Sequence, residues 1–137
     1  MHGERYEQLI AFLLTHLPGP VGREERADDV LVFTGGWPGE VVARLTRSSV
    51  IVEEYRVGRD TPDAPVVRPR RVGVVKWRRL PETETMNAIE QLIAGAREMR
   101  RGRYRVCPSC GTNTSPELLS DEGICQACKE RDQSEGR

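Results

Sequence analysis

Four cysteines near the end of the chain constrain its fold more than any other feature. They form two Cys-x-x-Cys pairs, Cys107 with Cys110 and Cys125 with Cys128, and fourteen residues separate the pairs. Each short pair can turn back on itself and place both sulfurs on one metal ion, so two pairs complete a tetrahedral shell. The spacing therefore predicts one structural Zn2+ bound by all four thiolates.

Two disulfides or four free thiols are the alternatives to a metal site. No stretch of the sequence approaches the ~20 apolar residues of a membrane span. The N-terminus lacks the cationic region and the small-residue cleavage site of a signal peptide. These features predict a cytoplasmic protein without a membrane segment, and thiols in that compartment stay reduced and available to zinc.

The predicted zinc shell leaves no open coordination position for water or substrate, so a catalytic zinc is not expected. His2 and His16 lie far from the cysteines in the sequence. No nucleophile and base stand out as a pair, and Glu53 and Glu54 would alternate to opposite faces of a strand. The sequence therefore predicts a protein that is not an enzyme.

Hydrophobic patterning over the first hundred residues predicts two helices and four strands. Apolar residues recur at three- and four-residue spacing over 4–17 and from 82 to about 102, the second helix starting with a threonine N-cap. Segments 22–29 and 58–69 are polar or proline-rich, which indicates loops. Runs of apolar and β-branched residues predict strands at 30–33, 41–45, 50–57 and 72–78.

These elements predict an α+β fold, in which a four-stranded antiparallel sheet carries both helices on one face. Gly73 within the fourth strand is interpreted as a bulge. The predicted organisation is an α+β domain over 1–103, a four-cysteine zinc finger over 104–132 and a flexible tail over 133–137.

The finger has features of two structural types. A short strand over 104–106 leads into the first cysteine pair, and the segment after Cys128 continues well as a helix. The second pair would then lie on the first helical turn, where the helix dipole favours thiolate, as in a treble clef. A zinc ribbon, with both pairs on hairpin knuckles, is the other interpretation.

The finger also resembles known zinc-binding families. The string Cys107-x-x-Cys110-Gly111 and the closing Ile124-Cys125-x-x-Cys128-Lys129 resemble the finger of DksA/TraR-type regulators, which bind RNA polymerase, and the zinc-binding domain of the ClpX chaperone, which binds adaptors. The resemblance covers the finger alone. It implies a zinc-finger fold with the four cysteines as ligands.

Charge is balanced over the whole chain but not along it. Lys+Arg against Asp+Glu is 7 to 11 over residues 1–65, 11 to 4 over 66–105 and 3 to 6 over 106–137, which sums to 21 of each. The acidic finger would repel phosphates, so the first functional hypothesis is a protein-interaction or adaptor module with an unidentified protein partner. Assembly as a homo-oligomer is compatible with that hypothesis.

Nucleic-acid binding through the basic middle segment, as in a transcription-associated regulator, is the alternative hypothesis. Trp77 and Tyr104 are the aromatic side chains that could stack on bases in that case. The basic residues that would contact phosphates are Arg68, Arg70, Arg71, Lys76, Arg78, Arg79, Arg97, Arg100, Arg101, Arg103 and Arg105.

Overall fold

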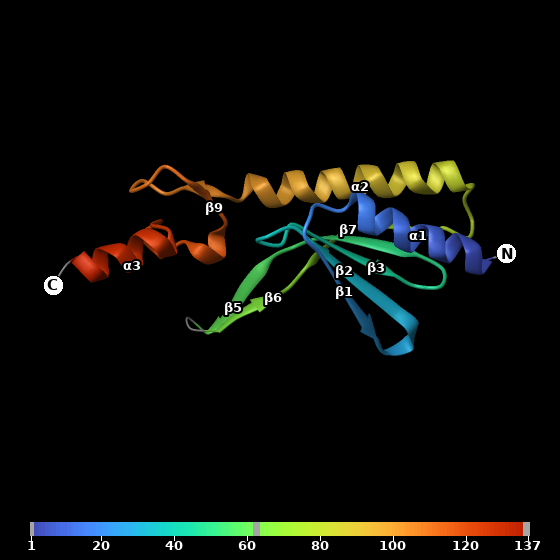
Figure 1. The fold of residues 1–137 in the computed structure, drawn as a ribbon, viewed down its shortest axis with the longest axis horizontal. Coiled ribbons are helices and arrows are strands. Elements are labelled where there is room, and N and C mark those ends of the chain that lie inside the picture. Colours follow the sequence, from blue (N-terminus) through green and yellow to red (C-terminus); the bar gives the residue numbers. More distant parts are fainter. Residues whose placement is uncertain (1, 62–63, 136–137) are drawn as a thin grey trace.

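An antiparallel sheet of five strands is the centre of the computed structural model, which describes residues 2–61 and 64–135 (Figure 1). The spatial order of the strands is β1-β2-β3-β4-β7. Their bounds are β1 Val21–Arg26, β2 Val30–Gly35, β3 Val41–Leu45, β4 Val50–Glu54 and β7 Arg70–Val75. Two smaller sheets pair β5 (Val57–Thr61) with β6 (Ala64–Val67), and β8 (Arg105–Val106) with β9 (Asn113–Thr114).

In the described part of the chain, three α-helices accompany the sheets: α1 (His2–His16), α2 (Glu82–Gly102) and α3 (Gln126–Glu135). Single 3-10 turns lie at Ala27–Asp29 and Pro116–Leu118. Within the residues that the structure describes, no helix combines the length and the apolar composition needed to cross a membrane.

The hydrophobic core lies on one face of the sheet, beneath α1 and α2. Alternate residues of each strand point to that face, so Phe33 of β2 and Val52 of β4 are fully buried there. Leu13 of α1 and Ile89 of α2 are buried in the same cluster. Figure 1 shows both helices on this side of the sheet, as the sequence pattern predicts, and the cysteine-containing segment beyond the C-terminal end of α2.

The predicted four-strand count is wrong, because β1 forms a fifth strand where a polar loop was expected. Its sequence, Val-Gly-Arg-Glu-Glu-Arg, has no apolar alternation, and five of its six residues are exposed. It pairs with β2 from Val21 opposite Gly35 to Arg26 opposite Val30. Backbone hydrogen bonds order this edge strand, and charged side chains are well tolerated at a sheet edge, so hydropathy gives no signal for it.

The connection expected over 58–69 is also partly structured. Strands β5 and β6 form a hairpin there, with Val57 opposite Val67. The strand predicted at 50–57 ends at Glu54, and the one predicted at 72–78 lies at Arg70–Val75. The threonine N-cap is wrong as well, since Pro81 occupies that position and no side chain caps α2.

The bulge interpreted at Gly73 is confirmed. Val52 pairs with Gly73 while Glu53 pairs with Arg71, so β7 carries one extra residue between them. A Cβ at Gly73 would lie 2.6 Å from a methyl carbon of Leu92. Glycine therefore permits α2 to approach the sheet closely at this point.

The close approach of Gly35 to the end of α1 generates a stability prediction. A Cβ at Gly35 would lie 2.8 Å from the backbone oxygen of Pro18 and 3.1 Å from Leu17 Cβ. We expect Gly35→Ala to lower the free energy of unfolding by about 1–3 kcal/mol, because backbone must move to make room. Gly95→Ala is the matched control, since nothing lies within 4 Å of its Cβ position in α2, and it should gain up to about 1 kcal/mol. Urea titration measures both, and equal effects of the two variants would contradict the packing.

Candidate metal centre

The four cysteine sulfurs meet at one point in the structure. Their Sγ atoms all lie within 4.8 Å of one another, and Cys110 Sγ is 3.7 Å from Cys125 Sγ. A tetrahedral site with metal–sulfur bonds of about 2.3 Å has sulfur–sulfur edges of about 3.8 Å. Cys107, Cys110, Cys125 and Cys128 are therefore positioned to bind a single metal ion.

The first cysteine pair lies on the tight turn of the β8–β9 hairpin. The backbone N–H of Cys107 donates to the Thr112 carbonyl at 3.0 Å, and the N–H of Gly111 donates to the Cys107 carbonyl at 2.7 Å. Gly111 has a φ of 76°, a left-handed conformation that glycine adopts without strain. This turn brings the Cys107 and Cys110 sulfurs to the same side of the hairpin.

The second pair lies at the start of α3. Cys125 forms an antiparallel bridge with Leu119 and immediately precedes the helix. The N–H of Lys129 donates to the Cys125 carbonyl at 3.0 Å, which closes the first helical turn and places Cys128 within it. The positive end of the helix dipole favours thiolate at this position. A hairpin turn and a helix start thus face each other across the four sulfurs.

Hydrogen bonds to sulfur favour the thiolate form at the first pair. The backbone N–H of Cys125 donates to Cys107 Sγ at 3.3 Å, and it is the main reason that the pKa of Cys107 falls to about 6. The Thr112 hydroxyl, 3.3 Å from Cys110 Sγ, is the main cause of a lowered pKa at Cys110. These two sulfurs are prepared to act as anionic ligands.

Ionisation of the last sulfur is opposed by its neighbours. A hydrogen bond with the Ser109 side chain lowers the pKa of Cys128, but contact with the Cys125 sulfur, together with burial, outweighs it and raises the pKa to about 12. Thiolates this close together repel one another unless a bound cation offsets their negative charge. Metal binding would therefore release the remaining protons of the cluster.

The basic residues of the middle segment divide into two groups, and the first lies at the end of α2. We call Arg97, Arg100, Arg101 and Arg103 the helix-end arginines. Arg101 Nε donates to Glu40 Oε1 at 2.5 Å, and Arg103 Nε donates to the buried Glu54 at 2.6 Å. Arg97 lies 3.7 Å from Glu40. Two carboxylates of the sheet domain thus pair with these three cations, because Glu40 is shared by Arg97 and Arg101.

Arg100 is buried, with 1% of its surface exposed. Its Nε donates to the Gly39 carbonyl at 3.0 Å, and its Nη2 donates to the Glu117 carboxylate of the cysteine-containing segment. The guanidinium carbon lies 5.2 Å from the ring centroid of Tyr55 and 5.3 Å from that of Tyr104. Arg100 therefore joins the β2–β3 turn, α2 and the candidate metal segment, and sequence reasoning, which placed Arg100 among surface cations, missed this role.

The second basic group surrounds β7 and is exposed. Arg105 is also exposed, and it donates to the carbonyls of Gly102 and Tyr104. Trp77 is only 1% exposed and its Nε1 donates to the Thr46 carbonyl at 3.1 Å, so its ring is not available to stack on a base. The exposed residues around β7 are Arg68, Arg70, Arg71, Lys76, Arg78 and Arg79.

Comparisons with protein-family models, with curated proteins and with solved structures gave no match to this chain. The candidate metal centre therefore rests on the spacing of its cysteines and on the geometry of their sulfurs. The contacts that attach this segment to the sheet are likewise described from the structure of this chain alone.

Loss of the Arg100 guanidinium should destabilise the whole structure. We expect Arg100→Gln to lower the free energy of unfolding by about 3 kcal/mol or more, because Glu117 would remain largely buried without its cation. Arg105→Gln removes an exposed arginine five residues away and should change stability by less than about 0.5 kcal/mol. Chemical denaturation compares the two variants. A similar small change in both would show that the buried contact contributes no stability.

Proposed function

We propose that this chain is a non-catalytic protein-docking module, stabilised by one structural Zn2+ in a finger of the treble-clef type. The succession of a cysteine-bearing hairpin and a cysteine-bearing helix start supports this finger type over a zinc ribbon. Four soft thiolate ligands at tetrahedral spacing favour zinc among the common divalent metals.

A structural role for the zinc follows from the ligand set. Four protein sulfurs fill a tetrahedral shell, so no position remains for a substrate or an activated water. Cys107, Cys125 and Cys128 are buried, and only Cys110 reaches the surface. The buried residues of the finger cluster are these three cysteines, with Leu119 and Ile124 partly buried against them. So small an apolar cluster needs a metal to fold.

The exposure of the Trp37 side chain is the observation that supports the docking proposal. Trp37 lies in the turn between β2 and β3 and is 88% exposed. Helix α2 anchors this turn, because Gly39 and Glu40 accept hydrogen bonds from Arg100 and Arg101. Tryptophan is among the side chains enriched at the energetic centres of protein interfaces.

The nucleic-acid alternative has less support. Ion pairs with Glu40, Glu54 and Glu117 occupy the helix-end arginines, and Trp77 is buried. The remaining exposed cations around β7 are compatible with a solvated sheet edge, where charged residues prevent aggregation. These contacts favour a protein partner over a phosphate backbone.

Removal of one zinc ligand should unfold the finger and spare the sheet. We expect Cys125→Ser to abolish stoichiometric zinc binding and to expose residues 104–132 to rapid amide exchange. Strands β2 and β3 should stay protected from amide exchange. The melting temperature of the protein should fall, because Glu117 would no longer pair with Arg100, by roughly 4–8 °C for each kcal/mol of stability lost. Metal analysis and hydrogen exchange measured by mass spectrometry test this. Collapse of the far-UV spectrum of the whole chain would instead make the finger integral to the core.

Truncation of Trp37 should weaken partner binding without affecting the fold. Once a partner is captured from lysate and purified, we expect Trp37→Ala to weaken its affinity by roughly thirtyfold, the value of a hot-spot residue. Leu14→Ala, which removes a 43% exposed apolar side chain from α1, should have no comparable effect. Unchanged affinity in Trp37→Ala would contradict the docking surface. Steeply salt-dependent binding of DNA or RNA by the same variant would favour the alternative function.

A further inference from the structure

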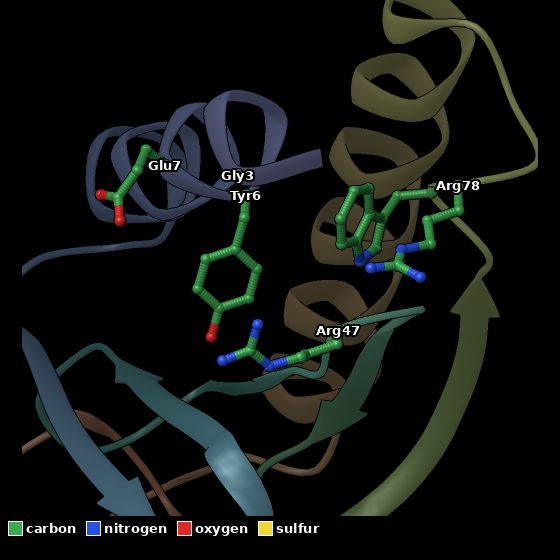
Figure 2. Close-up of a pocket in the computed structure, with 6 residues that line it drawn as sticks. Gly3, Tyr6, Glu7, Arg47 and Arg78 are labelled. Atoms are coloured by element: carbon green, nitrogen blue, oxygen red, sulfur yellow. The ribbon is translucent and has the colours of Figure 1, made fainter. Parts of the chain in front are cut away.

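A hollow of about 270 Å³ lies between the first turns of α1, the β3–β4 turn and the segment that follows β7. None of its lining residues belongs to the finger. The hollow is lined by Gly3, Tyr6, Glu7, Arg47, Trp77 and Arg78. Figure 2 shows the Tyr6 ring entering the hollow from α1, with its hydroxyl directed toward the Arg47 guanidinium. Arg78 approaches from the segment that follows β7, while the Glu7 carboxylate extends away from both guanidiniums.

The two arginines come from separate parts of the chain and converge on this hollow. Arg47 belongs to the turn between β3 and β4, and its partner there is Asp29 at 3.5 Å, with both side chains 72% exposed. Exposed ion pairs of this kind contribute little, so Arg47 can turn toward a ligand. Arg78 makes no ion pair within the described residues, and its guanidinium carbon lies 5.5 Å from the Trp77 ring centroid.

The aromatic platform beneath Arg78 is itself rigid. Trp77 is buried, donates a hydrogen bond to the Thr46 carbonyl, and lies 6.3 Å from the Tyr6 ring, centroid to centroid. A cation–π contact between a guanidinium and an indole limits the orientations that the arginine side chain can adopt. Arg78 is therefore partly pre-organised for a ligand.

We propose that this hollow binds a small phosphate monoester. Two guanidiniums match the charge of a phosphate dianion, and their planar forks can each donate paired hydrogen bonds to its oxygens. The Tyr6 hydroxyl supplies a further donor. The volume is slightly below the range of about 300–1,000 Å³ that is usual for drug-sized ligands, so it fits a phosphate with a small body. This site is independent of the proposed docking function and of the metal.

The chain offers a direct fluorescent probe of this site. It contains two tryptophans, and Trp37→Phe leaves Trp77 as the sole emitter. Inorganic phosphate, and then O-phosphoserine, would be titrated into this variant of the full chain at constant ionic strength, with sodium chloride as the compensating salt. We expect a saturable change in Trp77 emission, because a phosphate bound by Arg78 would alter the electrostatic environment of the neighbouring indole ring.

Three variants made in the Trp37→Phe background decide the outcome. Arg47→Gln and Arg78→Gln should each weaken phosphate binding by about tenfold or more, as expected for one lost charge-assisted hydrogen bond. Arg79→Gln is the matched control, since Arg79 is exposed but does not line the hollow. An emission change that chloride reproduces, or that survives unaltered in Arg47→Gln, would overturn the proposal. So would an oligonucleotide that binds through these arginines when phosphate and O-phosphoserine do not.

Discussion

The buried guanidinium of Arg100 is the contact on which the arrangement of the molecule depends. An unpaired charge could not remain at 1% exposure, because desolvation would cost far more than a small protein's net stability. Arg100 is tolerated because Gly39, Glu117 and two tyrosine rings surround it. Gly39 belongs to the β2–β3 turn and Glu117 to the finger. Tyr55 directly follows β4, and Tyr104 lies between α2 and β8. One side chain therefore fixes how three parts of the chain meet.

This contact links the metal centre to the presented surface. Glu117 lies between the two cysteine pairs, so its position depends on the closure of the four-sulfur cluster. On the opposite side of Arg100, the Gly39 carbonyl belongs to the turn that carries Trp37. A metal ion that orders the finger thereby helps to hold that turn in place. We propose that a metal ion at this site contributes to function through positioning of the turn.

The sequence predicts features that depend on local pattern, and it misses those that depend on distant partners. Cysteine spacing identifies the metal cluster, and apolar periodicity identifies α1, α2 and the buried strands. The sequence pattern does not predict strand β1, because backbone pairing with β2 orders it and its polar side chains do not. The helix-end arginines read as a surface patch because Glu40 lies 61 residues from Arg101 in the sequence. Only the fold brings such pairs together.

X-ray absorption at the zinc K-edge of protein purified under reducing conditions tests the central claim most directly. A closed four-cysteine centre predicts one zinc per chain, surrounded by four sulfur scatterers at about 2.3 Å and by no nitrogen or oxygen in the first shell. Protein that neither contains zinc nor takes it up, or a zinc with oxygen or nitrogen ligands in place of the sulfurs, would contradict the account.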